Sequence, residues 1–467
     1  MNQKLESFFD SLKGKTVAFM GLGVSHRDLI SLFAARGIRV LACDKRSREQ
    51  LGELAEEMEA KGAILHLGEH YFENLEADVL FRTPGMNFFL PELTAFRQQG
   101  GVVTSEMEVF FDLCPCPIYA VTGSDGKTTT TTLIAKMLEQ TGFTVHLGGN
   151  IGRALLPIIE DIQPGHRAVV ELSSFQLISM RSSPNVAVVT NVAPNHLDVH
   201  KDMAEYVDAK KNLLLHQNAF SRTVLNRDND YTRSFAQLVR GEQLWFTRGE
   251  QPENGAFLAS NGTLSMAFHG QVIPVVHKDD IRIPGIHNVE NYLAAISAVW
   301  GTVSPEAMTE VAKTFGGVEH RIELVRELEG VRWYNDSIAS SPSRTIAGLN
   351  SFNQKIIMLA GGYDKKIPFE PLAPVILEKV KLLILTGHTA DKIQQAVTSC
   401  SDYEQSGLVI VRAQNMQEAV TLAQSRAKAG DVVSLSPACA SFDAYPNFEA
   451  RGRHFKELVT ALEPLAK

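Results

Sequence analysis

Residues 118–129 read Ile-Tyr-Ala-Val-Thr-Gly-Ser-Asp-Gly-Lys-Thr-Thr, and this stretch decides the fold at the centre of the chain. Its first four residues form an apolar run that predicts a buried strand, and a helix-compatible segment follows Thr129. A glycine-rich turn between a strand and a helix presents successive backbone N–H groups, which can cradle phosphates. Lys127 would reach the terminal phosphates, and the Thr128 hydroxyl would bind Mg²⁺. The stretch therefore predicts a nucleotide triphosphate site, although Val121 stands where a standard Walker A motif has its first glycine.

On both sides of this stretch, short apolar runs alternate with helix-length segments, which predicts βαβ units and parallel sheets. The runs expected to form strands are 16–20, 40–44, 78–81, 118–121, 168–171, 186–190, 356–360, 382–386, 408–411 and 432–435. Residues 240–283 differ, because pairs such as Asn254-Gly255 and Asn261-Gly262 predict hairpins. This segment is expected to be a small β-rich subregion.

The chain of 467 residues is long enough for about three domains of roughly 150 residues each. Cys114-Pro115-Cys116-Pro117 marks a break, because two prolines in three positions cannot continue a helix. We therefore expect an α/β protein of three consecutive domains. These are a Rossmann-like N-terminal domain over 1–114, a P-loop-type central domain over 115–318 that contains the β-rich subregion, and a Rossmann-like C-terminal domain over 319–467.

The composition excludes several classes of protein. Hydrophobic residues make up 44% and charged residues 21% of the chain, whereas disorder requires low hydrophobicity and high net charge. The net charge of −8 argues against a protein whose overall positive charge binds nucleic acid. No apolar run approaches the roughly 18 residues that a membrane-spanning helix needs. The first residues lack the apolar core of a secretory signal. Five scattered cysteines have no redox or zinc spacing, so we expect a reduced, cytoplasmic compartment. Nothing in the sequence demands an oligomer, so we expect a monomer.

A second glycine turn, Gly21-x-Gly23-x-x-His26, follows the first strand and opens a helix. Such a turn lets backbone approach a phosphate, but His26 occupies the third glycine position of the dinucleotide fingerprint, which argues against an NAD site. Asp44 ends the second strand and could accept hydrogen bonds from a ribose or a uracil, and Arg46 could contact a phosphate. A tight turn that binds no ligand is the alternative interpretation.

Two post-strand segments suggest a magnesium site near the phosphate loop. Glu171 ends a strand, at the position where α/β sheets bind ligands, and its carboxylate is a hard ligand that suits Mg²⁺. The segment 191–200 follows the next strand and brings polar side chains, including His196, into a loop. Lys210 and Lys211 lie farther along on an expected helix. A lysine pair on a helix is usually solvated, and spacing alone predicts that for both.

Taken in order, these motifs resemble the Mur ligase family of cell-wall amide ligases, and the resemblance spans essentially the whole chain. Further motifs that carry it are Gly285-x-His287-Asn288-x-x-Asn291, His320-Arg321, Asn335-Asp336-Ser337, 361–365, 436–443 and 447–452. The resemblance implies domains that bind, in order, a UDP-linked substrate, ATP and an amino acid. It also implies ATP-dependent amide formation through an acyl phosphate, with D-glutamate added to UDP-N-acetylmuramoyl-L-alanine in the synthesis of peptidoglycan precursors.

The resemblance assigns roles to individual residues. The catalytic residues would be Lys127, Glu171, His196 and Lys210. The ATP site would comprise Gly123, Ser124, Asp125, Gly126, Lys127, Thr128, Thr129, Asn288, Asn291, Arg321 and Asp336. The UDP substrate would be bound by Gly23, Val24, Ser25, Asp44, Lys45, Arg46, Gly85, Asn150 and Ser173, and D-glutamate by Lys365, Ser441, Phe442 and Phe448. One or two Mg²⁺ ions would be held by Thr128, Glu171, His196 and Lys210. Because an ammonium cannot ligate a cation, Lys210 would act as a carbamate formed with CO₂.

Some positions depart from the family pattern or allow another interpretation. Many relatives have Lys where this chain has Ile338, so another cation must replace it here or the contact is dispensable. Asp125 stands where Asn is commoner. Phe442 and Phe448 could be plain core residues. The rival functions are another amino-acid ligase of the superfamily, such as a folate polyglutamylating enzyme, and a nucleotide-binding regulator without ligase chemistry. An NAD dehydrogenase is the most distant alternative.

Overall fold

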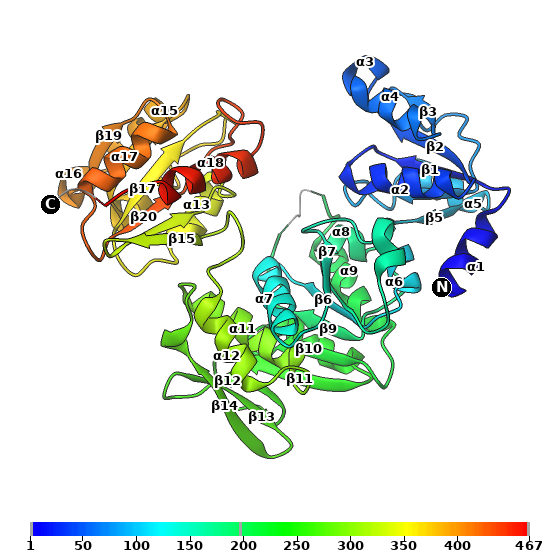
Figure 1. Cartoon of the computed structure of the whole chain (residues 1–467), viewed down its shortest axis with the longest axis horizontal. Coiled ribbons are helices and arrows are strands. Elements are labelled where there is room, and N and C mark those ends of the chain that lie inside the picture. The colour runs from blue at the N-terminus through cyan, green and yellow to red at the C-terminus, as the bar shows by residue number, and fades with distance from the viewer. Residues whose placement is uncertain (1–2, 196–198, 465–467) are drawn as a thin grey trace. The chain divides into compact units, whose positions relative to one another are not determined.

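The computed structural model describes residues 3–195 and 199–464, and the chain divides into two compact units (Figure 1). Unit 1 comprises Met1–Lys278 and Glu290–Val311, and unit 2 comprises Asp279–Val289 and Ala312–Lys467. Among the described residues, unit 1 contains a five-stranded and a nine-stranded sheet, and unit 2 contains a six-stranded sheet. Each sheet lies within one of the three ranges expected from the sequence, and the domain boundaries themselves stay predictions.

The first sheet of unit 1 is parallel throughout, in the order β3-β2-β1-β4-β5. Its strands are β1 (Thr16–Met20), β2 (Arg39–Asp44), β3 (Ile64–Leu67), β4 (Val79–Arg82) and β5 (Val102–Thr104). Its helices are α1 (Gln3–Leu12), α2 (Val24–Ala35), α3 (Arg48–Leu51), α4 (Glu53–Ala60), α5 (Pro91–Gln98) and α6 (Glu106–Leu113). With β1 between β2 and β4, the glycine turn after β1 opens at the carboxyl edge, where such sheets bind ligands.

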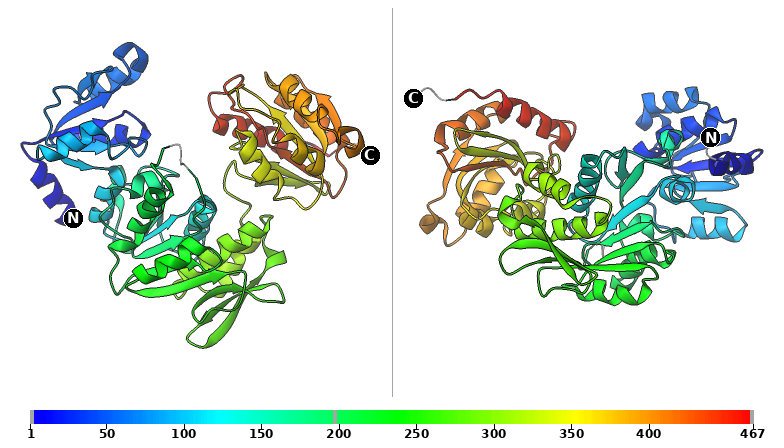
Figure 2. Two further views of the ribbon diagram at one scale, coloured as in Figure 1. Left: turned by 180° about the vertical axis from the view of Figure 1, so that it is seen from behind. Right: turned by 60° about the horizontal axis from the view of Figure 1, so that its bottom comes forward.

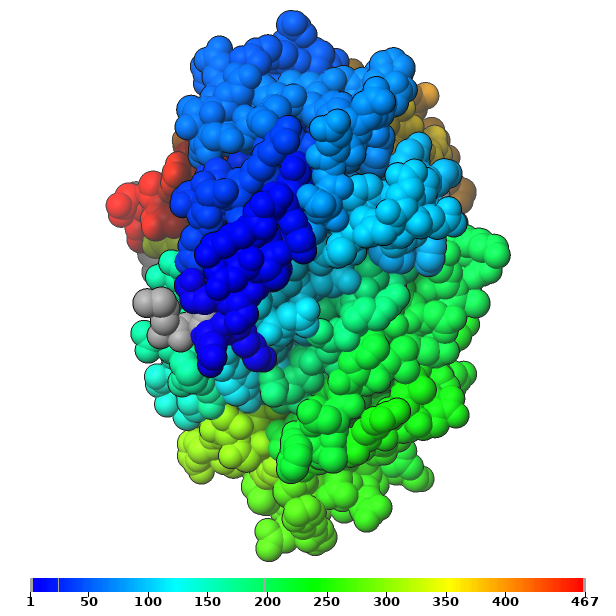
Figure 3. All heavy atoms as spheres, turned by 90° about the vertical axis from the view of Figure 1, so that its right-hand side faces the viewer, coloured from blue at the N-terminus to red at the C-terminus, as the bar shows by residue number. Residues whose placement is uncertain are grey.

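Aromatic side chains fill the core beneath this sheet. Phe19 of β1 stacks on Phe81 of β4 with ring centroids 4.9 Å apart, and Phe33 of α2 meets both rings edge-on at 5.3 Å. Phe9 extends the cluster by packing against Phe33 at 5.2 Å. This contact holds α1, dark blue in Figure 3, on the surface of unit 1.

The second sheet of unit 1 has the order β14-β13-β12-β11-β10-β9-β6-β8-β7. Its strands are β6 (Ile118–Thr122), β7 (Val145–Gly149), β8 (Arg167–Glu171), β9 (Val186–Val189), β10 (Arg222–Asn226), β11 (Glu242–Thr247), β12 (Gly255–Leu258), β13 (Thr263–Phe268) and β14 (Gln271–His277). The strands from β7 to β12 pair in parallel, and β12, β13 and β14 pair antiparallel. The hairpin expected at Asn261-Gly262 is confirmed, because it joins the antiparallel strands β12 and β13. The hairpin expected at Asn254-Gly255 is wrong, because this pair lies between β11 and β12, which run parallel. The antiparallel strands extend the central sheet at its far edge (Figure 2).

The helical segments between residues 127 and 314 are α7 (Lys127–Gln140), η1 (Leu156–Asp161), α8 (Ser174–Leu177), α9 (Met203–Leu215), α10 (Asp230–Ser234), η2 (Phe235–Leu238), η3 (Lys278–Asp280), α11 (Ile286–Val299) and α12 (Pro305–Thr314). Since β6 lies between β8 and β9, the segments that follow these three strands meet at one edge of the sheet. They are the phosphate loop, the segment after Glu171 and the segment after Thr190.

Unit 2 is built on a sheet of order β15-β16-β20-β17-β18-β19. Its strands are β15 (Glu323–Leu328), β16 (Val331–Asn335), β17 (Ile356–Gly361), β18 (Val380–Thr386), β19 (Val409–Arg412) and β20 (Val432–Leu435). Its helices are α13 (Pro342–Leu349), α14 (Ala373–Lys379), α15 (Ala390–Thr398), α16 (Tyr403–Ser406), α17 (Met416–Arg426) and α18 (Phe448–Thr460). All strand pairs are parallel except β15 with β16, as expected for an α/β domain with one added hairpin.

A buried arginine joins two post-strand loops of unit 2 to α18. Arg451 is 3% exposed. Its Nε donates to Ser337 Oγ at 3.0 Å, and Nη2 donates to Ser337 O at 2.9 Å. Its Nη1 donates to the carbonyls of Cys439 and Ala440, both at 3.1 Å. All of these acceptors are uncharged, and burial lowers the pKa of Arg451 to about 10. The guanidinium thus fixes the loops after β16 and β20.

Within residues 3–195 and 199–464, the helices are too short or too polar to span a lipid bilayer.

Replacing Arg451 with Met should lower the stability of unit 2 by about 2–4 kcal/mol, because four buried acceptors lose their charged donor. The matched control is Arg453→Met, two residues along the same helix at an exposed position. Hydrogen–deuterium exchange would be measured in residues 337–341 and 437–441. Faster exchange in Arg451→Met alone is expected, and equal exchange in the two variants would contradict the role given to this guanidinium.

Candidate active site

The phosphate loop requires glycine at two of its positions. Gly123 follows β6 with φ +153°, and a Cβ there would lie 1.8 Å from Thr190 Oγ1. Gly126 precedes α7 with φ +76°, and its Cβ would lie 2.4 Å from Asn291 Oδ1. L-residues rarely adopt either conformation, and at both positions a side chain would collide with a neighbour. The loop therefore packs tightly against the segment after β9 and against α11.

The loop is further held by hydrogen bonds that its backbone N–H groups donate to the neighbouring post-strand segment. The Ser124 backbone N–H donates to Asn191 O at 2.9 Å, and the Asp125 N–H donates to Asn191 Oδ1 at 2.9 Å. The Lys127 ammonium folds over the same loop and donates to the carbonyls of Gly123 (3.0 Å) and Ser124 (2.9 Å). This arrangement brings the expected cation and the loop backbone together. Thr128 and Thr129 follow in the first turn of α7.

Glu171 supplies a carboxylate at the same edge of the sheet. It ends β8 directly opposite Val121 of β6 and is 1% exposed. Its Oε1 accepts a hydrogen bond from Asn150 Nδ2 at 2.8 Å, whereas its buried Oε2 has no hydrogen-bond partner among the described residues. Buried polar atoms are rarely left unpaired, so an orphaned carboxylate oxygen here fits the coordination of a hard cation such as Mg²⁺.

Lys210 lies beneath the phosphate loop. Although it is on helix α9, it is 1% exposed, and its Nζ donates to Gly123 O at 2.9 Å and to Thr122 Oγ1 at 3.4 Å. Burial, with a further contribution from the charge of Lys127, lowers the pKa of Lys210 to about 7. Lys211, next in sequence, is partly exposed and pairs with Asp208 at 2.8 Å. The solvated position that spacing predicts is thus wrong for Lys210 and holds for Lys211.

The structure does not describe the remaining predicted metal ligand, His196. His196 lies outside the described residues, as do Leu197 and Asp198. Within the described ranges, no group of three or more His, Cys, Asp or Glu side chains is placed to hold a metal ion. The structure brings Lys127, Glu171 and Lys210 to the loop region, and their catalytic roles stay predictions.

The expected adenine contacts lie on helix α11. Asn291 is buried, and its Oδ1 accepts a hydrogen bond from Thr130 Oγ1 of α7 at 3.2 Å. Asn288 lies one turn earlier on the same helix and is also buried, with its side-chain amide donating to Pro284 O. Asn291 thereby connects α11 to the helix that follows the phosphate loop.

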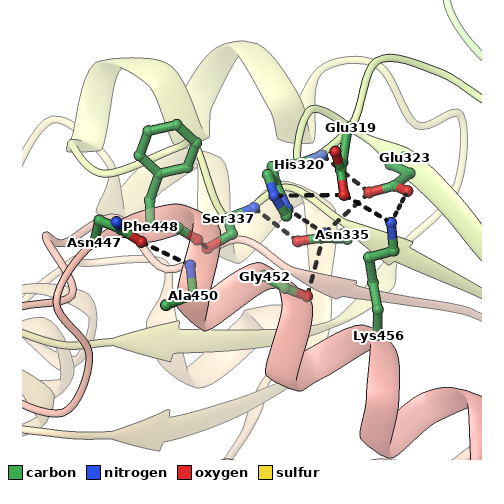
Figure 4. Close-up of polar contacts among 10 residues, drawn as sticks. All are labelled: Glu319, His320, Glu323, Asn335, Ser337, Asn447, Phe448, Ala450, Gly452 and Lys456. Atoms are coloured by element: carbon green, nitrogen blue, oxygen red, sulfur yellow. Dashed lines mark hydrogen bonds and ion pairs between the residues drawn. The ribbon is translucent and has the colours of Figure 1, made fainter. Parts of the chain in front are cut away.

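A network of polar side chains in unit 2 includes Asn335, which precedes Asp336, and His320, which precedes Arg321 (Figure 4). Asn335 Nδ2 lies 2.9 Å from His320 Nδ1 and donates to Glu323 Oε2 at 3.1 Å, which fixes the residues on either side of Arg321. Asp336 accepts a hydrogen bond from the Ile322 N–H at 3.3 Å, and its Oδ2 is buried without a hydrogen-bond partner in the described chain. Burial raises the pKa of Asp336 to about 7, against the opposing effects of that hydrogen bond and the Arg321 charge.

The expected D-glutamate residues also lie in unit 2, and they differ in exposure. Lys365 is exposed and Ser441 is buried. Phe442 is 62% exposed and contacts only the edge of the Tyr363 ring among the described aromatic pairs, at 5.8 Å. The interpretation of Phe442 as a core residue is therefore wrong. Phe448 begins α18 and is half-buried, with its ring edge-on to His320 at 5.9 Å.

The expected UDP residues lie at or just after the ends of β1, β2 and β4 in the first sheet and of β7 and β8 in the second. Asp44 Oδ2 accepts a hydrogen bond from the Leu22 N–H at 2.8 Å, and the carboxylate also binds the Arg46 guanidinium. Burial alone would raise the pKa of Asp44, but these hydrogen bonds outweigh it and lower the value to about 2. Gly23 caps α2, Ser173 caps α8, and Lys45 and Gly85 are exposed. Ser25 lies in the first turn of α2 beside Val24.

A cavity of about 200 Å³ joins the two sheets of unit 1. Two of the expected residues, Ser25 and Asn150, line it. His26, Arg82 and Glu106 line it as well, and sequence reasoning assigned no substrate contact to them. In the sequence, His26 is distinguished only by its departure from the dinucleotide fingerprint, and Arg82 and Glu106 belong to no recognisable motif.

The site and fold define a class of protein, and comparison with known families agrees. The profile of the Mur ligase middle domain matches residues 121–299, and that of the Mur ligase glutamate ligase domain matches residues 320–439. This chain belongs to the Mur ligase family.

Particular relatives are similar over their whole length. The chain is 52% identical to a UDP-N-acetylmuramoylalanine–D-glutamate ligase of Acetivibrio thermocellus, with 99% of this chain and 100% of the relative covered. It is 47% identical to the ligase of the same name from Clostridium botulinum strain Hall, at the same coverage. Among solved structures, a UDP-N-acetylmuramate–alanine ligase from Thermotoga maritima shares the fold with a TM-score of 0.57 and 17% identity, covering 96% of this chain and 99% of that one.

Replacing Gly126 with Ala should weaken ATP binding by at least about tenfold, because a left-handed conformation and the contact with Asn291 both oppose a side chain. Gly142→Ala is the matched control at the other end of α7, since its φ is +93° and its Cβ would meet no atom within 4 Å. ATP affinity would be measured by calorimetry. Equal affinities in the two variants would show that the loop does not depend on this close packing.

Proposed function

We propose that this chain is the ATP-dependent ligase that joins D-glutamate to UDP-N-acetylmuramoyl-L-alanine, with release of ADP and phosphate, in the cytoplasmic synthesis of peptidoglycan precursors. The observation that carries the proposal is the burial of the Lys210 amine beneath the phosphate loop, at the sheet edge where Glu171 ends β8. The full-length identity to ligases of that name supports the choice of substrates.

The chemistry activates a carboxylate, because an oxide ion is a poor leaving group. The terminal phosphoryl group of ATP passes to the carboxylate of the alanyl substrate and gives an acyl phosphate. The amine of D-glutamate then attacks the acyl carbon, and phosphate leaves from the tetrahedral intermediate. Phosphoryl transfer depends mainly on positioning and charge neutralisation. The loop from Gly123 to Gly126 provides the backbone cradle, and Lys127 provides a cation beside it.

The donor set fits magnesium, with Thr128 and Glu171 for one ion and His196 with carbamylated Lys210 for a second. Bound Mg²⁺ would neutralise phosphate charge at this edge of the sheet. The orphaned Glu171 Oε2 supports the first site. For the second, the neutral Lys210 amine attacks the carbon of CO₂ and loses a proton, which converts the side chain into an anionic carbamate. Its low pKa favours the step, because only the neutral amine is nucleophilic.

The other substrates are assigned to groups with matching chemistry. Asn288 and Asn291 bind the adenine, and Arg321 and Asp336 complete the ATP site. Lys365 offers an exposed cation for a D-glutamate carboxylate, beside Ser441, Phe442 and Phe448. The turn from Gly23 to Ser25, the segment from Asp44 to Arg46, Gly85, Asn150 and Ser173 bind the UDP-linked substrate. The enzyme acts as a monomer.

The proposal predicts that phosphate release in the presence of ATP, Mg²⁺ and UDP-N-acetylmuramoyl-L-alanine requires D-glutamate. Release would be measured with a panel of D- and L-amino acids. Release with a different amino acid would indicate another ligase of the superfamily. Failure to release phosphate with any of them would indicate a nucleotide-binding regulator.

Lys210→Ala should abolish turnover, and added formate or acetate should restore part of it by supplying a carboxylate in place of the carbamate. Lys211→Ala is the matched control, because its side chain is partly exposed and forms an ion pair with Asp208 on the same helix. Turnover of Lys210→Ala at the unsubstituted rate without added carboxylate would contradict the assignment.

Carbamylation of Lys210 should rise with pH at a fixed concentration of dissolved CO₂. Because the pKa of Lys210 is lowered to about 7, its ammonium form dominates below that value and the reactive neutral amine above it. The signal would be a ¹³C NMR carbamate resonance from ¹³CO₂, increasing from about pH 6 to about pH 8 and absent from Lys210→Ala. A signal of equal size in both proteins would place the carbamate elsewhere.

A further inference from the structure

Two residues that line the cavity of unit 1 each carry a buried polar atom without a hydrogen-bond partner. Within residues 3–195 and 199–464, five buried side-chain nitrogen or oxygen atoms have no hydrogen-bond partner, and two of them, His26 Nε2 and Arg82 Nε, belong to residues that line this cavity. Two others belong to Glu171 and Asp336, which the proposed ATP and Mg²⁺ sites already use. Unpaired buried groups are uncommon in native proteins and call for a missing ligand or water.

His26 can only accept a hydrogen bond at its free nitrogen. Its Nδ1 lies 2.9 Å from the Gly21 carbonyl oxygen, which cannot donate, so Nδ1 carries the proton. Burial lowers the pKa of His26 to about 4, which keeps the ring neutral and leaves a lone pair on Nε2. The ring is held in place by an edge contact with Phe19, with centroids 5.3 Å apart.

Arg82 complements this acceptor with a donor. It ends β4 and is 1% exposed. Its Nη1 donates to Met86 O at 3.1 Å, and its Nη2 donates to Phe175 O and Ser179 Oγ, both at 2.8 Å. These acceptors are neutral, and they fix the guanidinium across the junction of the two sheets. Its Nε–H remains for a ligand.

The acceptor His26 Nε2 and the donor Arg82 Nε determine which chemical group could pair with both. A fully ionised diphosphate offers only acceptors, and so it could satisfy Arg82 but would face the lone pair of His26. An amide carries both complementary groups, an N–H that can donate to His26 Nε2 and a carbonyl oxygen that can accept from Arg82 Nε.

The cavity also lies in the right place along the substrate. The nucleotide end is assigned to the Asp44 region of the first sheet, and the reacting carboxylate must reach the phosphate loop of the second. The cavity is lined from both sheets, by Ser25 and by Asn150. The diphosphate and the amino sugar lie between these two ends, and the amino sugar carries the amide.

We propose that His26 and Arg82 bind the N-acetyl amide of the substrate's amino sugar, and thereby contribute to its selection. This inference rests on the proposed function, since it takes the UDP-linked amino sugar as the ligand.

The test measures binding by calorimetry without ATP, so that it does not depend on turnover. The ligands are UDP-N-acetylmuramoyl-L-alanine, its analogue with a 2-hydroxyl in place of the acetamido group, and UDP. His26→Phe keeps an aromatic ring and removes the acceptor, and Arg82→Met removes the donor. Ser179→Ala is the control, because it removes one structural acceptor of Arg82 and does not line the cavity.

For the acetylated substrate, the dissociation constant should rise about 3- to 10-fold in His26→Phe and about 10- to 100-fold in Arg82→Met. It should stay nearly unchanged for UDP and in Ser179→Ala. Both variants should also lose the preference of the unsubstituted protein for the acetylated substrate over the 2-hydroxyl analogue. Where Arg82→Met does not fold, Arg82→Lys, which lacks an Nε donor, should show the same loss of preference.

Unchanged preference for the acetamido group in both variants would overturn the inference, as would an equal loss of affinity for UDP. Failure of the unsubstituted protein to bind UDP-N-acetylmuramoyl-L-alanine at all would instead count against the proposed function. The two failures are therefore distinguishable.

Discussion

The confinement of the Lys210 amine beneath the phosphate loop is the constraint on which the site depends. Its described hydrogen bonds go to the Gly123 carbonyl and the Thr122 hydroxyl, both neutral, and the charge of Asp125 offsets the effect of burial only in part. Burial therefore lowers the pKa of Lys210 to about 7, so a large share of the amine is neutral near neutral pH. The phosphate loop above the amine packs tightly against its neighbours. Thr190 and Asn291 lie so close to Gly123 and Gly126 that a side chain at either glycine would collide with them.

Much of the fold could be predicted from the sequence because most of its strands are buried in parallel sheets. Each of the ten expected runs coincides with a strand, because buried parallel strands read as continuous apolar segments. The sequence did not reveal β3, β5, β7, β10, β15 or β16. Strands β3, β5 and β7 lie at or beside sheet edges, where partial exposure weakens the apolar signal, and β15 and β16 form an antiparallel pair rather than a βαβ unit. The strand at 78–81 is consequently the fourth of its sheet rather than the third.

The candidate site was predictable where its residues fall in ordered motifs, and less so where only tertiary packing reveals them. The phosphate loop and Glu171 follow apolar strands and could be found directly. Helical spacing placed Lys210 on the surface, and only resemblance to a family distinguished it from Lys211. Arg82 occupies an ordinary strand end, so its position at the junction of two sheets could not be anticipated. A signal for His26 existed, because it departs from a glycine fingerprint, but it indicated only that NAD was an unsuitable ligand.

The central claim is that this fold activates a carboxylate by phosphoryl transfer before amide formation. The most direct measurement uses UDP-N-acetylmuramoyl-L-alanine with both oxygens of its alanyl carboxylate labelled with ¹⁸O, together with ATP, Mg²⁺ and D-glutamate. The account predicts that each turnover transfers one labelled oxygen to inorganic phosphate and leaves the other in the new amide. Unlabelled phosphate accompanying amide formation would contradict it.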